Sequence, residues 1–143
     1  KDALLKLQED IDIRKIRTML AMATSDLNAI QELSKQATKN DYEASTIFKL
    51  HYDVLHQLAE AFVRFDRVKS LNHHCLFAHL LEKHPELELS WDALEEIRTK
   101  RNGIQYYGTP ITYADRKRLE LPLTLSINTL KKAVEEKLKT AKI

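Results

Sequence analysis

Apolar residues recur at helical spacing along most of the chain. The first run alternates intervals of three and four residues, which predicts one long helix from about Asp10 to Thr38. Upstream of it, Leu4, Leu5 and Leu7 either extend this helix or form a separate arm. The stripe of the first helix consists of Ile13, Ile16, Leu20, Ala23, Leu27 and Ile30.

A polar break separates this run from a second helix, and Asp41 is the expected N-cap of the second helix. A short third helix follows, which Asn72 can cap. It should end at His84, because Pro85 disfavours helical geometry in the residue before it. The second helix carries His51, Val54, Leu58, Ala61, Phe65 and Val68 on one line, widened by Phe48, Leu55 and Phe62.

The last two predicted helices have clear boundary signals. Ser90 is the expected N-cap of a helix over 91–107, and Gly108 suits the left-handed position after its end. Thr112 and Asp115 have the spacing of a capping box. One stripe continues from there across a proline, so we expect a single kinked helix. Its members are Leu119, Leu123, Ile127, Leu130, Val134 and Leu138, with Pro122 between the first two.

These patterns predict an all-α fold, an antiparallel bundle of four to five helices without strands. The chain has 143 residues, 43% of them hydrophobic and 31% charged, with only two Gly and three Pro. We expect residues 1–143 to form a single helical domain. No apolar window is long enough to span a membrane, so no membrane partner is expected.

Charge and cysteine content narrow the classes of partner and compartment. Lys and Arg number 23 against 21 Asp and Glu, so the net charge is +2 and any basic patch must be local. Cys75 is the only cysteine, which excludes an internal disulfide and favours a cytoplasmic location. The first residues lack the apolar core of a signal peptide. Because the sequence begins with Lys1, we expect a trimmed product.

The end of the fourth predicted helix carries the strongest functional signal. Arg101 falls on the apolar stripe formed by Leu94, Ile97 and Ile104. An unpaired charge buried there would cost several kcal/mol. Arg101 therefore needs a partner, a ligand or a second subunit.

Several polar side chains surround this arginine in sequence. At 100° per residue, Arg101 and Tyr106 lie about 140° apart and should not share a face, whereas Arg101 pairs with Gln105 and Asn102 with Tyr106. Gly103 implies close packing or an early helix end. The set could recognise phosphate or carboxylate, with Arg101 as a bidentate fork and Asn102 and Tyr106 as neutral donors. It could also be an ordinary helix C-terminus, where cations favour the dipole and tyrosine rings pad the bundle end.

The helix order and the Arg-Asn-x-x-x-Tyr-Tyr-Gly run from Arg101 to Gly108 resemble the HEPN superfamily of small prokaryotic helical domains. In that family an Arg, usually followed by Asn, precedes a catalytic His by five positions. Active members are metal-independent ribonucleases, and many are toxins or antiviral effectors. Others accompany nucleotidyltransferases as inactive or substrate-binding partners. The resemblance implies a homodimer in which the motif helices of two copies meet.

This chain departs from the family at the catalytic position, where Tyr106 replaces His. An unperturbed tyrosine titrates near pH 10, so its ionisation at neutral pH costs roughly 4 kcal/mol. Loss of nuclease activity is the expected outcome. If activity persists, the resemblance assigns catalysis to Arg101 and Tyr106, with Tyr106 able to donate a hydrogen bond or a proton.

Two further sets of residues have the chemistry of a binding site. The loop between the last two helices is flanked by Arg98, Lys100 and Arg101 on one side and by Arg116, Lys117 and Arg118 on the other. If these helices pack antiparallel, the cations share one end of the bundle and could bind an RNA backbone, with Tyr106, Tyr107 and Tyr113 for base stacking. Neighbouring carboxylates could instead make this end a solvated rim, which we favour. Cys75 and His79 lie one turn apart but need a third metal ligand, such as His51 or His56. We therefore expect no metal site and no cofactor.

The sequence thus predicts a cytoplasmic, prokaryotic, HEPN-like protein of a toxin–antitoxin or defence-type system. The leading hypothesis is a non-catalytic or weakly catalytic partner protein that binds RNA or a nucleotide. Its expected binding site consists of Arg101, Asn102, Tyr106, Tyr107, Arg98 and Lys100. Its expected partners are a second copy and a nucleotidyltransferase-type protein. The alternatives are a metal-independent endoribonuclease that uses Arg101 and Tyr106 at a dimer interface, and a purely structural interaction protein.

Overall fold

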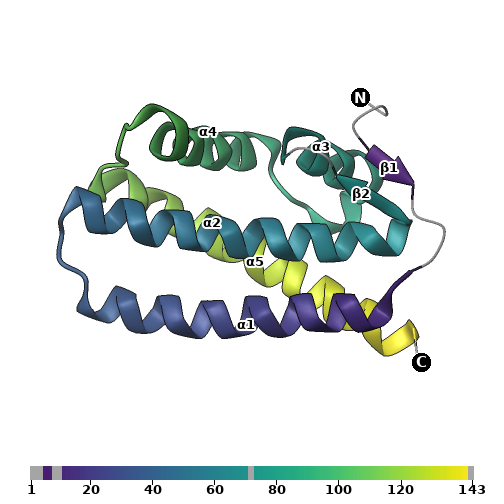
Figure 1. The fold of residues 1–143 in the computed structure, drawn as a ribbon. Coiled ribbons are helices and arrows are strands. Elements are labelled where there is room, and N and C mark those ends of the chain that lie inside the picture. The colour runs from purple at the N-terminus through teal and green to yellow at the C-terminus, as the bar shows by residue number, and fades with distance from the viewer. Residues whose placement is uncertain (1–4, 8–10, 71–72, 142–143) are drawn as a thin grey trace.

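The computed structural model describes residues 5–7, 11–70 and 73–141. Within them the chain is a bundle of five α-helices, which confirms the all-α prediction (Figure 1). The helices are α1 (Ile13–Gln36), α2 (Asp41–Val63), α3 (His73–Lys83), α4 (Trp91–Tyr107) and α5 (Tyr113–Ala141). None of these helices is both long and apolar enough to cross a membrane.

The central element is α2, because it contacts all four other helices. In Figure 1, α1 runs along one side of α2, α3 and α4 cover the other side, and α5 crosses behind. The burial pattern follows from this position. Twelve residues of α2 are buried, whereas α1 buries only Ile16, Ala23 and Ile30. The buried stripe of α1 is therefore narrow, whereas that of α2 extends around most of its circumference.

The first helix and the start of the second lie close to their predicted positions, with one correction. Asn40, and not Asp41, is the N-cap of α2, because its Oδ1 accepts hydrogen bonds from the amides of Tyr42 and Glu43. Asp41 is the first helical residue. The N-cap of α1 is Asp12, whose side chain accepts a hydrogen bond from the amide of Lys15.

The second helix is shorter than predicted. It ends at Val63 and continues as a 3₁₀ turn, η2 (Arg64–Asp66), after which Arg67 has a left-handed φ of 62°. That conformation breaks the helix, so Phe65 and Val68 do not prolong its stripe.

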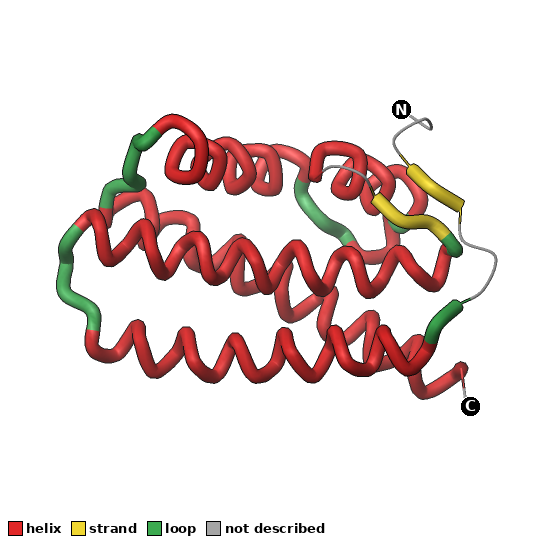
Figure 2. Tube along the Cα trace, viewed as in Figure 1, coloured by secondary structure: helices red, strands yellow, loops and turns green. Residues whose placement is uncertain are grey.

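The prediction that the chain has no strands was also wrong. Strand β2 (Val68–Ser70) pairs antiparallel with β1 (Leu5–Leu7), and Figure 2 shows the two beside the end of α2. Residues Leu5–Leu7 are therefore a separate arm and not an extension of α1. A strand of three residues is too short for its alternation of apolar and polar side chains to be recognised in a sequence with mainly helical spacing. The pairing also joins segments that are far apart in the chain, so no local pattern predicts it.

The second half of the chain matches its predicted boundaries. Ser90 caps α4 by accepting a hydrogen bond from the amide of Ala93, and Gly108 ends α4 with a φ of 63°. Thr112 Oγ1 accepts from the amide of Asp115 at the start of α5, which then runs unbroken through Pro122. Helix α3 ends at Lys83, one residue before the predicted limit, and a 3₁₀ turn, η3 (Pro85–Leu87), follows. The predicted cap Asn72 lies outside the described residues.

Candidate functional site

Arg101 lies on the core side of α4, as the apolar stripe predicted. Leu94 and Ile97 on the same side are fully buried, and Arg101 itself is half-buried. Its guanidinium carbon lies 5.2 Å from the ring centre of Tyr52, a fully buried residue of α2. Burial raises the pKa of Tyr52 far above its ordinary value, and the positive charges of Arg101 and Arg98 only partly oppose this shift. Arg101 thus rests on a neutral aromatic surface.

Two polar groups lie beside the same guanidinium. Arg101 Nη1 donates two long, weak hydrogen bonds, one to Asn102 Oδ1 and one to the hydroxyl oxygen of Tyr106, each with a donor–acceptor distance of 3.4 Å. The guanidinium carbon is also 5.6 Å from the ring centre of Tyr106. The expectation that Arg101 and Tyr106 point apart was wrong, since two long side chains bridge the angle between their Cα positions.

Within the described part of the chain, no carboxylate lies within ion-pair distance of Arg101. The carboxylate of Asp53 on α2 interacts electrostatically with Arg101 but forms no ion pair with it. Burial raises the pKa of Asp53, and the positive charges of Arg101 and Lys49 do not cancel this effect. Arg101 is therefore in direct contact only with aromatic and neutral polar groups among the described residues, and Asp53 acts on its charge without forming an ion pair.

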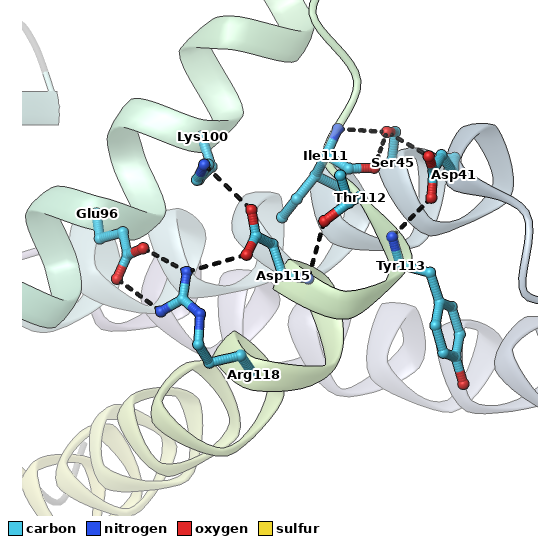
Figure 3. A network of polar contacts seen from close by, with 9 residues as sticks. All are labelled: Asp41, Ser45, Glu96, Lys100, Ile111, Thr112, Tyr113, Asp115 and Arg118. Carbon is cyan, nitrogen blue, oxygen red and sulfur yellow. Dashed lines mark hydrogen bonds and ion pairs between the residues drawn. The ribbon is translucent and has the colours of Figure 1, made fainter.

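The neighbouring cations behave differently, because each has a carboxylate partner. Arg98 pairs with Glu95 at 2.9 Å, and Lys100 Nζ lies 3.3 Å from Asp115 Oδ2. Arg118 contacts Glu96 at 2.5 Å and Asp115 at 3.4 Å (Figure 3). Arg116 and Lys117 both contact Glu120. These ion pairs favour the solvated rim over an open basic surface at this end of the bundle.

A polar corner holds the end of α4 against α2. Ser45 Oγ on α2 accepts a hydrogen bond from the amide of Ile111 at 2.9 Å and donates to the carbonyl of Asp41 at 2.8 Å. Asp41 Oδ1 accepts from the amide of Tyr113 at 2.7 Å. Figure 3 shows how these bonds join the α4–α5 loop to the start of α2. Asp41, predicted as a helix cap, is instead a tertiary acceptor.

The predicted site residues divide between two sides of α4. Arg98, Lys100, Asn102 and Tyr107 line a groove of about 550 Å³ along α4 and the following loop. Arg101 and Tyr106 are not among its described lining residues, although Tyr106 and Tyr107 are 65% and 78% exposed. Asn102 is common to both sides, since it contacts Arg101 and lines the groove.

Gly103 does not mark close packing or an early helix end. The helix continues for four further residues, to Tyr107. A Cβ atom at Gly103 would meet the carbonyl oxygen of Thr109 at 3.7 Å, which is an ordinary contact distance. Its carbonyl accepts the amides of Gly108 and Thr109, which closes the helix end.

His56 and His79, the two histidines closest in role to the missing catalytic one, would each have to lie beside Arg101 and Tyr106 to replace it. The ring of His56 stacks against Tyr52, with ring centres 6.4 Å apart, so His56 lies one aromatic ring from the Arg101 region. His79 is at the other end of the bundle, beside Asp66.

A second polar cluster was missed by sequence reasoning. Asp66 from η2, His79 from α3 and His84 after α3 bring three potential ligand atoms within 4.8 Å of one another. The signal in the sequence was two histidines flanking the end of one helix, but their carboxylate partner lies 13 residues before the first of them. Cys75, one turn before His79 and a possible metal ligand by its spacing, is buried and does not belong to this cluster.

Burial and hydrogen bonding act in opposite directions in this second cluster. Burial alone lowers the pKa of His84, but hydrogen bonds to Asp66 and Glu86 outweigh it and raise the pKa above its ordinary value. Burial alone raises the pKa of Asp66, yet the hydrogen bonds from His84 and His79 bring it below its ordinary value. The cluster therefore favours an ionised carboxylate beside a protonated imidazole.

Comparison of the chain with protein-family models, with curated proteins and with solved structures found no match.

Proposed function

We propose that the protein is a HEPN-like, non-catalytic binding partner for RNA or a nucleotide, acting in a prokaryotic toxin–antitoxin or defence-type system, and that Arg101 binds phosphate. The observation that carries this proposal is the state of Arg101, which has no carboxylate partner among the described residues. Its cationic neighbours all have one. A guanidinium without a counter-ion, held by neutral groups, is suited to receive an external anion.

The groups around Arg101 support a phosphate ligand. Asn102 and Tyr106 each place a polar atom 3.4 Å from Nη1, where their donor groups are available to phosphate oxygens. The ring of Tyr52 packs against the guanidinium and holds it in place, so the Arg101 side chain loses less conformational entropy when a phosphate binds. The exposed rings of Tyr106 and Tyr107 offer stacking surfaces for unpaired bases.

The proposed complex is a homodimer in which the α4 ends of two copies meet, with a nucleotidyltransferase-type protein as a further partner. Tyr106 and Tyr107 are large, exposed side chains at this end of α4, and such residues are enriched in interfaces. Sedimentation equilibrium would report the association state. Tyr107→Asp should shift a dimer towards monomer, because it introduces a charge into the proposed interface.

The binding test compares Arg101→Gln with Arg14→Gln, which alters an exposed cation at the far end of α1. We expect wild type to bind fluorescently labelled tRNA, and Arg101→Gln to weaken binding about 10- to 100-fold, as for loss of a charged hydrogen bond. The slope of log affinity against log salt should fall by about 0.7–0.9. Equal affinity of wild type and Arg101→Gln, or no binding by wild type, would refute the proposal.

One observation favours the alternative, a metal-independent endoribonuclease. The hydroxyl of Tyr106 lies beside Arg101, so an acidic O–H and a phosphate-binding cation would share one site. Denaturing gels of tRNA incubated with a chelator would decide between the two functions. Cleavage by wild type that is lost in Arg101→Gln would establish the enzyme. Cleavage only by Tyr106→His would identify a nuclease scaffold that has lost its base.

A further inference from the structure

We propose that Asp66, His79 and His84 form a binding site for one divalent transition-metal ion of the zinc class. This site goes beyond the proposed RNA-binding function and lies in another part of the bundle. Tyr52, beneath Arg101, and Val63, three residues before Asp66, are separated by eleven residues of α2, or about 16 Å at 1.5 Å per residue. The elements that carry the cluster, η2 and α3, both contact β2, and Figure 1 shows α3 and β2 at the same end of the molecule.

Three side chains from separate elements converge on one point. His79 Nε2 lies 2.8 Å and His84 Nε2 lies 2.5 Å from the same oxygen, Asp66 Oδ2. All three ligand atoms lie within 4.8 Å of one another. Tetrahedral zinc with bonds of about 2.0–2.2 Å separates its ligand atoms by about 3.4 Å. Side-chain movements of less than about 1 Å would therefore open the cluster enough to admit the ion.

The second nitrogen of His84 already has the partner that a ligand histidine needs. Its Nδ1 lies 2.9 Å from Glu86 Oε2, and a carboxylate can only accept, so Nδ1 carries a proton. Nε2 is therefore the nitrogen that would bind the metal, after it gives up the proton that it donates to Asp66. A carboxylate on the far side of a ligand imidazole fixes the tautomer and increases the basicity of the ligand nitrogen.

The apolar surroundings fix the two rings. The ring of Phe62 on α2 packs edge-on against His84, with centres 4.7 Å apart. His79 is only 8% exposed. The side chain of Asp66 remains 26% exposed, which leaves a path for an ion from solvent. Rigid ligands with one open side reduce the entropy lost when a metal binds.

The donor set indicates the class of ion. Two imidazoles and one carboxylate suit zinc and neighbouring first-row metals, whereas calcium and magnesium prefer oxygen ligands. Three protein ligands leave a fourth position for water. In the metal-free cluster both Nε2 atoms donate to Asp66. Binding of the ion therefore releases one proton from His84, which is protonated on both nitrogens, whereas a singly protonated His79 keeps its proton by moving it from Nε2 to Nδ1.

The test measures zinc binding to chelator-stripped protein by competition with a chromogenic chelator. We expect one zinc ion per chain, and Co²⁺ to give the strong visible bands of four-coordinate geometry without thiolate charge transfer from Cys75. Glu86→Gln should weaken zinc binding about 10- to 100-fold. Asp66→Asn, which removes a ligand but keeps a hydrogen-bond acceptor, should weaken it at least as much. His51→Gln removes a histidine elsewhere and should leave zinc affinity unchanged.

Two results would overturn the proposal: wild type binding no zinc in competition, or Asp66→Asn and Glu86→Gln both binding as tightly as wild type. In either case the cluster would be a hydrogen-bonded junction between η2 and α3. Because Glu86 is on the surface, Glu86→Gln should fold normally and decides the question if Asp66→Asn does not fold. RNA binding should be unchanged in these variants, so this proposal can fail independently of the proposed function.

Discussion

Arg101 of α4 lies 5.2 Å from the ring centre of Tyr52 on α2, and this contact joins the candidate site to the most buried helix of the fold. An aromatic face attracts a cation without neutralising it. The contact therefore holds the guanidinium in place and leaves its charge available. A carboxylate in the same position would have stabilised the helix pair but blocked the site.

The contact between Arg101 and Tyr52 should be measurable as a coupling energy. In a double-mutant cycle of Arg101→Met and Tyr52→Leu, we expect a coupling of about 0.5–2 kcal/mol, the range for a partly desolvated cation–π pair. The measurement is urea unfolding of the wild type, both single variants and the double variant. Additive single effects would show that the two residues are neighbours without being energetically linked.

The hydrogen bond between Ser45 of α2 and the α4–α5 loop should contribute measurably to the stability of the fold. Ser45→Ala removes the acceptor of the buried Ile111 amide, and we expect a loss of about 1–3 kcal/mol in the free energy of unfolding. Thr46→Ala is the matched control, because the exposed Thr46 hydroxyl only donates to the carbonyl of Tyr42. Its effect should stay within about 0.5 kcal/mol. Similar losses in both variants would contradict a special role for Ser45.

The two glycines should respond in opposite directions to alanine. At Gly103 an added Cβ meets only ordinary contacts inside a helix, so Gly103→Ala should raise the free energy of unfolding by about 0.5–1 kcal/mol. Gly108 has a φ of 63°, where Gly108→Ala should lower it by about 1–2 kcal/mol. Thermal and urea unfolding would measure both. A loss of stability at Gly103 would mean that this position needs its flexibility.

His51 should make stability depend on pH. Burial and the positive charge of Arg116 lower its pKa below the ordinary 6.5, although Glu120 opposes them. Lys35 of α1 lines the same cavity of about 410 Å³. Because the unfolded chain binds the proton more readily, the contribution of His51 is complete above pH 6.5. It is lost as the pH falls through 6.5 towards the folded-state pKa.

The matched variant for this effect is His51→Gln, which removes the titrating group. As the pH falls through that window, we expect the wild type to lose more unfolding free energy than His51→Gln does. Denaturant unfolding across the pH range measures it. His84 titrates in the opposite sense and cancels in the difference. A difference that is constant with pH would contradict the burial of His51 as the cause.

Features that depend on neighbouring residues could be predicted from the sequence. The helical periods, the Ser90 cap, the end of α4 at Gly108 and the continuation of α5 through Pro122 all depend on contacts within a few residues. The placement of Arg101 on the core side of α4 followed from the same periodicity. Local sterics and hydrogen bonds decide these features before the helices pack.

Contacts between distant groups depend on how the helices pack and could not be predicted from the sequence. The β1–β2 pair, the Arg101–Tyr52 contact and the use of Asp41 as an acceptor for Tyr113 each join segments far apart in the chain. The same holds for the meeting of Asp66 with His79 and His84, which depends on how the end of α2 turns. Periodicity identifies which face of a helix is buried. It does not identify the opposing residue, because that depends on the angle and offset at which two helices pack.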